Sequence, residues 1–65
     1  MMSDNKVHDL QLAEAVREAC IAAALSGYED AGMSGLCHEG RWECAISAMR
    51  VVDLEAVLKS RNDTT

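Results

Sequence analysis

The chain has 65 residues, enough for one domain, and a domain of this size buries only about 60% of the surface of its unfolded chain. Chains this short therefore depend on disulfides, a metal ion, very regular helix packing or a partner subunit. Eleven acidic residues against six basic ones give a net charge of −5, which opposes nucleic-acid binding because that needs clustered lysine and arginine.

The first predicted element is a long helix from Asp9 to about Ala31. This segment is rich in strong helix formers, and the Asp9 carboxylate is a candidate N-cap. Residues 1–8 show no apolar periodicity and are expected to be disordered. The helix has one predicted core face, made of Leu12 or Ala13, Val16, Ala19 or Cys20, Ala23 and a residue near Gly27.

Residues 19–25 of this helix are apolar on every side. If one face of this helix packs on its own chain, a second apolar face stays exposed to water unless another chain packs on it. We therefore predict a homodimer with Val16, Ile21 and Leu25 at its interface, as when two helical hairpins pair into a bundle. The alternative is that alanine is tolerated anywhere on a helix, so that only two large side chains need cover.

A glycine-rich break follows. Gly32 is the predicted left-handed residue that ends the first helix, and the Ser34 hydroxyl is the predicted cap of the next. A short helical segment over residues 35–39 would then end at a second turn at Gly40. The alternative is a continuous helix through Gly40, at a cost of about 1 kcal/mol relative to alanine.

After Gly40, the only tryptophan begins a stripe with the i, i+3, i+4, i+7 spacing of one helix face. The predicted core anchors are Trp42, Ala45, Ile46 and Met49. An indole in the core and an indole at an interface between chains both bury a large apolar area, so the spacing alone leaves these two roles of Trp42 open.

The last predicted helix is short, with Asp53 as its N-cap and an apolar patch at Leu54, Val57 and Leu58. It is too short to stand alone and must lie on another helix. Residues 61–65 are expected to be disordered. No proline occurs, and no window shows the alternation of a strand, so the predicted class is all-α: a small three- to four-helix hairpin or bundle over residues 9–60, completed by homodimerisation.

Residues 40–46, Gly-Arg-Trp-Glu-Cys-Ala-Ile, resemble the start of the second helix of a tetratricopeptide repeat. The resemblance implies that Gly40 and Ala45 allow two helices to approach closely. Residues 17–20, 28–32 and 35–43 resemble segments of short, uncharacterised bacterial helical proteins, some of which carry an automatic acetyltransferase label. Acetyl transfer from acyl-CoA ordinarily needs a mixed sheet and a phosphate-binding turn, so no catalytic residue is carried over.

The cluster with most chemical potential is Cys37-His38-Glu39 with Cys44. Structural zinc takes four ligands, usually from paired units one helical turn apart, and that spacing is absent. Adjacent Cys37 and His38 point about 100° apart on a helix. Two interpretations stay open here: a ligand- or metal-binding regulator using Cys37, His38 and Cys44, and a packing cluster with a boundary imidazole. No cofactor and no catalytic residue are predicted.

The functional prediction is a small, acidic protein–protein interaction module, an adaptor or accessory subunit. The predicted location is the cytoplasm, because three widely spaced cysteines do not suggest a disulfide framework and the N-terminal residues lack a leader pattern. The longest apolar run, residues 19–25, is too short to span a bilayer. An enzyme is the third alternative, and the sequence offers little to support it.

Overall fold

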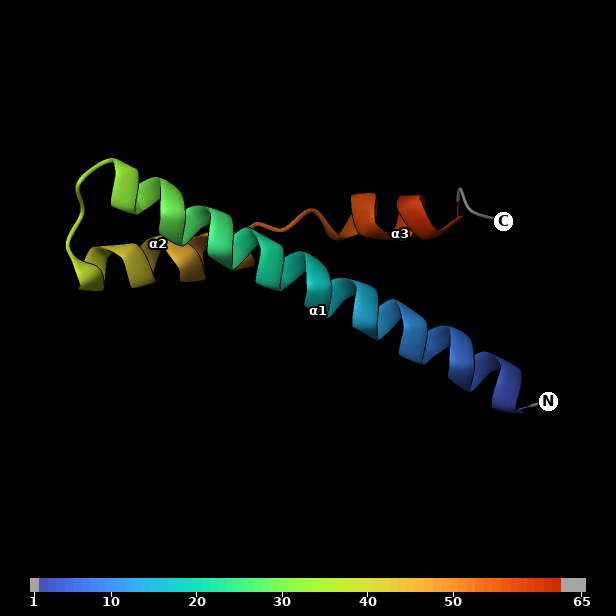
Figure 1. The fold of residues 1–65 in the computed structure, drawn as a ribbon. Helices are drawn as coiled ribbons and strands as arrows, with labels where there is room; N and C mark the ends of the chain where they lie inside the picture. The colour runs from blue at the N-terminus through green and yellow to red at the C-terminus, as the bar shows by residue number, and fades with distance from the viewer. Residues whose placement is uncertain (1, 63–65) are drawn as a thin grey trace.

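The computed structural model describes residues 2–62, and the side chains of residues 8–60 (Figure 1). Three helices make up this part of the chain: α1 (Met2–Met33), α2 (His38–Arg50) and α3 (Leu54–Asn62). Residues 2–62 contain no strand, which confirms the all-helical class. The disorder predicted for residue 1 and residues 63–65 lies outside the described residues.

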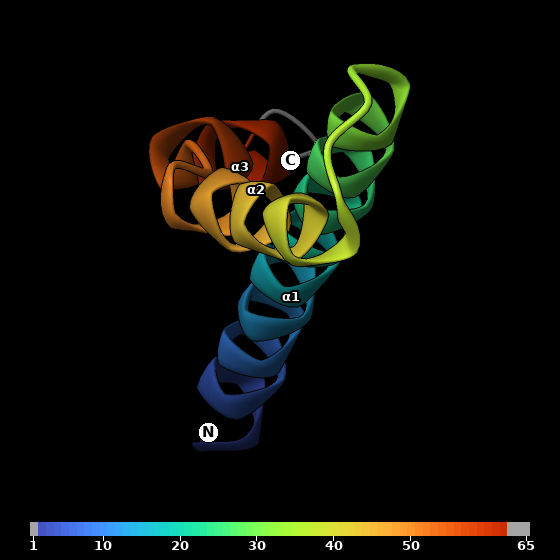
Figure 2. The same cartoon turned by 90° about the vertical axis from the view of Figure 1, so that its left-hand side faces the viewer.

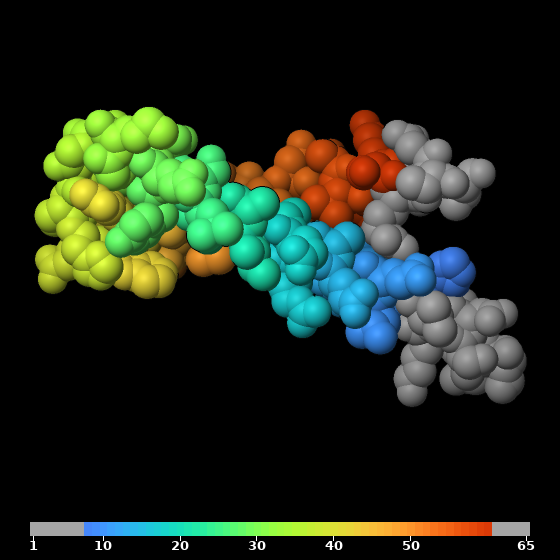
Figure 3. Space-filling model, in the orientation of Figure 1, coloured from blue at the N-terminus to red at the C-terminus, as the bar shows by residue number. Residues whose placement is uncertain are grey.

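The helices form two layers. α2 and α3 follow one another along the chain in one layer, and α1 crosses diagonally over both in the other (Figures 1 and 2). Figure 3 shows the coloured part of α1, from residue 8 on, as a diagonal band, with α2 below it at one end and the coloured part of α3 above it at the other. α1 and α2 run antiparallel and form a helical hairpin, whereas α3 packs on α1.

α1 is longer than the sequence predicted. It begins at Met2, so Asp9 lies inside the helix and the predicted N-cap at Asp9 is wrong. The physical reason is that no glycine or proline occurs between residues 2 and 9, and nothing there stops a helix from continuing toward the N-terminus. None of the helices within residues 2–62 combines the length and apolar character needed to cross a bilayer.

α1 ends in a Schellman motif centred on Gly35, not on Gly32. Gly35 has φ +86°, its N–H donates to the Gly32 carbonyl at 3.0 Å, and the Leu36 N–H donates to the Ala31 carbonyl at 3.0 Å. Gly32 is therefore helical. Ser34 belongs to the end of α1, with its N–H bonded to the Asp30 carbonyl, and does not cap α2.

α2 runs without a break through Gly40, so the predicted second turn is wrong and the continuous alternative is correct. Its N-cap is Cys37, which makes no side-chain capping bond, and the Arg41 N–H donates to the Cys37 carbonyl at 2.9 Å. A Cβ at Gly40 would lie 3.2 Å from Leu36 Cδ2. Glycine at this position thus lets the Leu36 side chain fold back against the first turn of α2.

The hairpin closes where small residues meet. A Cβ at Gly27 would lie 3.0 Å from both the Cys44 carbonyl oxygen and Ala48 Cβ. Ala45 is 2% exposed and Ala31 is 5% exposed, and these two alanines are the only buried apolar residues among the described side chains. The helices therefore touch almost backbone to backbone, with little room for large side chains between them.

α3 begins as the sequence predicted. Asp53 Oδ1 accepts a hydrogen bond from the Ala56 N–H at 3.1 Å, and the Val57 N–H donates to the Asp53 carbonyl at 3.2 Å. This confirms Asp53 as the N-cap. A shallow hollow between α1 and α3 is lined by Ala15, Glu18, Ala56, Val57 and Ser60.

Candidate interaction surface

One face of the α1–α2 hairpin carries two parallel columns of large apolar side chains. Both columns have the i, i+4, i+7 spacing of a helix stripe. The Tyr28 and Trp42 rings meet edge to face with centroids 5.9 Å apart, which sets the register of the two antiparallel helices. We call this surface the apolar ladder; it consists of Ile21, Leu25 and Tyr28 on α1 and Trp42, Ile46 and Met49 on α2.

The apolar ladder is open to solvent in the single chain. The exposed fractions of its side chains are 46% for Ile21, 60% for Leu25, 54% for Trp42, 42% for Ile46 and 37% for Met49, and Tyr28 is half-buried. Counted from the Tyr28–Trp42 contact along the two antiparallel helices, Leu25 and Ile46 each lie about one turn away, and Ile21 and Met49 each lie about two turns away. These five side chains are among eleven exposed large apolar side chains in residues 8–60, and their helical spacing places them on one face of the hairpin.

The ladder contains members of two sets that were predicted separately, the interface residues of α1 and the core anchors of α2. Of the four predicted core anchors, only Ala45 is buried in the single chain, because α1 covers the Ala45 side of α2 and leaves the side bearing Trp42, Ile46 and Met49 uncovered. Ile21 and Leu25, predicted as interface residues of α1, lie in the facing column.

Val16 and Tyr28 differ from the sequence-based grouping. Val16 is half-buried, and its place five residues before Ile21 turns it about 140° around α1, away from the ladder. Tyr28 is not among the predicted interface residues, although its position three residues after Leu25 puts it on the same stripe. The missing information was the register of α2 against α1.

A hydrogen-bonded aromatic cluster of Tyr28, His38 and Trp42 lies at one end of the ladder. Trp42 Nε1 donates to His38 Nε2 at 3.1 Å, and His38 Nδ1 lies 3.0 Å from the Tyr28 hydroxyl oxygen. Because an indole N–H can only donate, Nε2 must be an acceptor. With Nε2 as the acceptor, Nδ1–H is the donor to the Tyr28 hydroxyl oxygen.

Arg41 ties the α1–α2 turn to this cluster. Its Nε donates to the Leu36 carbonyl at 2.9 Å, and its guanidinium carbon lies 5.9 Å from the centroid of the Tyr28 ring. A Cβ at Gly32 would lie 3.3 Å from the guanidinium, so Gly32 gives this side chain room to cross α1. The Tyr28 ring is thus held by Arg41, His38 and Trp42 together.

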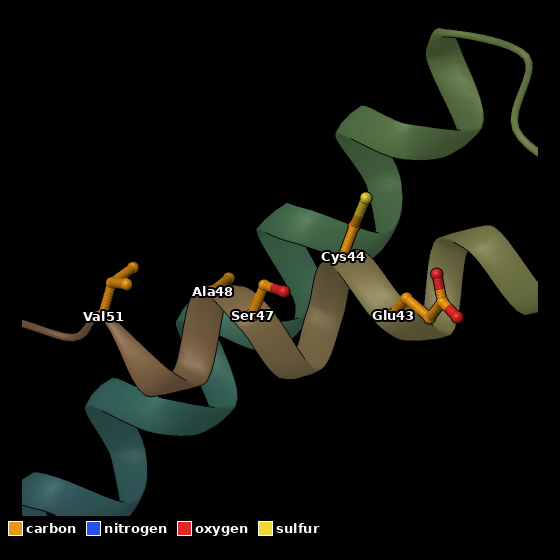
Figure 4. A pocket seen from close by; sticks show the side chains of 5 residues that line it. All are labelled: Glu43, Cys44, Ser47, Ala48 and Val51. Atoms are coloured by element: carbon orange, nitrogen blue, oxygen red, sulfur yellow. The ribbon is translucent and has the colours of Figure 1, made fainter.

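The three candidate ligand residues do not form a common site. Cys37 is exposed at the start of α2, and Cys44 is half-buried beside a shallow hollow lined by Glu43, Ser47, Ala48 and Val51 (Figure 4). Both ring nitrogens of His38 already have hydrogen-bond partners. Within the part of the chain that the structure describes, no three His, Cys, Asp or Glu side chains are grouped to hold a metal ion.

Comparison of the chain with protein-family models, with curated proteins and with solved structures finds no match.

Proposed function

We propose that this chain is a small protein–protein interaction module, an adaptor or accessory subunit, and that the apolar ladder is its contact surface. The observation that carries the proposal is the contrast between the inside and the outside of the molecule. Among the described side chains only two alanines are buried apolar residues, while five large apolar side chains of the ladder remain 37–60% exposed. An exposed apolar surface of this kind is typical of a binding face.

The energetics favour occupation of the ladder. Fully burying a large apolar side chain is worth about 1.5–3 kcal/mol, so covering five side chains that are about half exposed contributes roughly 5 kcal/mol. The whole folding free energy of a 65-residue domain is only about 3–10 kcal/mol. A partner on this surface would thus contribute as much as the fold itself.

The aromatic cluster supplies the features of an interface anchor. Tryptophan and tyrosine are enriched among the residues that dominate binding energy. In the single chain, hydrogen bonds to His38 already hold the Tyr28 and Trp42 rings in place. Little side-chain entropy is therefore lost when a partner binds. This supports Trp42 and Tyr28 as the pre-organised end of the contact surface.

The test is affinity capture from the native cell with mass spectrometry, using three forms of the tagged full chain: unmodified, Leu25→Glu and Leu54→Glu. Leu25 and Leu54 are 60% and 54% exposed helical leucines, and Leu54 lies on α3 outside the ladder, so the two substitutions are matched. Proteins bound through the ladder should be retained by Leu54→Glu and lost by Leu25→Glu. Capture that is unchanged by Leu25→Glu would contradict the proposal.

A further inference from the structure

We infer that the occupant of the apolar ladder is a second copy of this chain, related by a twofold axis that lies in the interface and runs across the two columns at Leu25 and Ile46. This inference rests on the proposed function, because it names the partner of the same surface. It assigns the chain to an isologous dimer in which two helical hairpins stack into a four-helix arrangement.

The exposed area of the chain is the first argument. A compact monomer of 7.0 kDa exposes about 4,000 Å², whereas this chain exposes 5215 Å². The excess, about 1,200 Å², exceeds the roughly 800 Å² that each partner buries in an interface of standard size. The chain as a whole therefore exposes more surface than a compact monomer of its mass, by an amount of the order that one partner buries in a dimer interface.

The shape of the chain leads to the same conclusion. Its radius of gyration is 15.1 Å, against about 11 Å for a compact domain of 65 residues, and its extents are 51 × 20 × 13 Å. The chain measures 13 Å along its shortest axis, and within residues 8–60 the side chains of the ladder have no further helix over them. Stacking a second copy on the ladder would enclose the large side chains that the hairpin leaves exposed.

The ladder is also complementary to itself. Its two columns have equal length, with aromatic rings at one end, Tyr28 and Trp42, and flexible aliphatic side chains at the other, Ile21 and Met49. A twofold axis that lies in the interface and runs across the two columns places the aromatic end of each copy on the aliphatic end of the other copy. Methionine adapts to irregular surfaces and makes favourable sulfur–aromatic contacts, so Met49 suits the Trp42 ring of the second copy.

The charge of the chain separates this dimer from a complex with a basic protein. Two copies of net charge −5 repel one another, and salt screens that repulsion. Self-association through the ladder should therefore strengthen as salt is added. Binding of a basic partner to this acidic chain should weaken under the same change.

The experiment is sedimentation equilibrium of the full chain from about 1 μM to about 1 mM, a range that brackets weak and moderate association. The samples are the unmodified chain, Leu25→Glu, Leu25→Lys, an equal mixture of these two variants, and Leu54→Glu as the matched control. Helical circular dichroism is recorded on every sample. Because Leu25 lies beside the proposed axis, its two copies face each other, and opposite charges there should pair in a mixed dimer.

We expect the unmodified chain and Leu54→Glu to sediment as dimers that tighten with salt. Each Leu25 variant alone should associate at least about tenfold more weakly, and the mixture should recover dimer. Recovery is informative even if each variant loses helix by itself, because two chains that are merely misfolded do not restore one another. Helix and dimer should then return together on mixing.

Three results would overturn the inference. They are an unmodified chain that is helical and monomeric at the highest concentration, a dimer that Leu25→Glu leaves intact, and a mixture that fails to recover. If the chain is monomeric but its captured proteins are still lost with Leu25→Glu, the proposed interaction surface stands and only its occupant is wrong. If capture is also unchanged, the proposed function fails as well.

Discussion

Gly27→Ala tests the closest contact of the hairpin. In an open helix, replacing glycine by alanine stabilises the helix by about 1 kcal/mol. At Gly27, however, the new methyl would lie 3.0 Å from the Cys44 carbonyl oxygen and 3.0 Å from Ala48 Cβ. One of these neighbours is backbone, which cannot rotate away, so α1 and α2 must separate to admit the methyl group.

The expected magnitude follows from the two opposing terms. Overpacking of this kind costs about 1–3 kcal/mol, which outweighs the gain of about 1 kcal/mol in helix propensity. We expect a net loss of about 1 kcal/mol, or a fall in Tm of about 4–8 °C for a domain of this size. Gly32→Ala is the matched control, because its methyl meets only the flexible Arg41 guanidinium at 3.3 Å, and it should leave stability unchanged or raise it.

The assay is thermal and urea unfolding followed by circular dichroism at one fixed chain concentration, since association makes Tm depend on concentration. The double variant Gly27→Ala/Ala48→Gly adds a second test. It removes the methyl–methyl contact but keeps the contact with the Cys44 carbonyl, so it should not recover the lost stability. A Gly27→Ala chain at least as stable as Gly32→Ala would refute the close backbone approach.

Three further predictions concern single side chains. Asp53→Ala removes the cap of α3 and should cost about 1 kcal/mol, seen as faster amide exchange in α3 with α2 unchanged; uniform exchange would count against the capping role. Nitrogen NMR should find the His38 proton on Nδ1 and none on Nε2, as the Trp42 donor requires, and the opposite tautomer would disprove the cluster geometry. Zinc should leave Tm unchanged, whereas a rise that Cys37→Ser abolishes would establish a metal site instead.

The features that depend on neighbouring residues were predictable from the sequence. Asp53 was identified as an N-cap because a capping bond spans only three residues. The all-helical class followed from the absence of proline and of strand alternation. The end of α1 was harder, since Gly32 and Gly35 both fit a left-handed cap and local preference does not choose between them. In the structure Gly35 takes the left-handed conformation, and Arg41 crosses Gly32 and donates to the Leu36 carbonyl.

The features that depend on side-chain packing, and not on local backbone preference, were not predictable. Gly40 was expected to form a turn because glycine weakens a helix by about 1 kcal/mol, but packing of Leu36 against it accompanies a continuous α2. The stripe from Trp42 to Met49 was recognised, yet its spacing does not say which element covers it. The pairing of Tyr28 with Trp42 depends on the register of two helices and therefore on where the turn lies.

The most direct measurement of the central claim is the emission maximum of Trp42, the only tryptophan, as a function of chain concentration. Trp42 is 54% exposed in the single chain, so a second copy on the apolar ladder must remove much of its indole from water. We predict a shift to longer wavelength on dilution, reversed by salt and absent in Leu25→Glu. An emission maximum typical of a solvated indole at the highest concentration, with helical circular dichroism retained, would contradict the account.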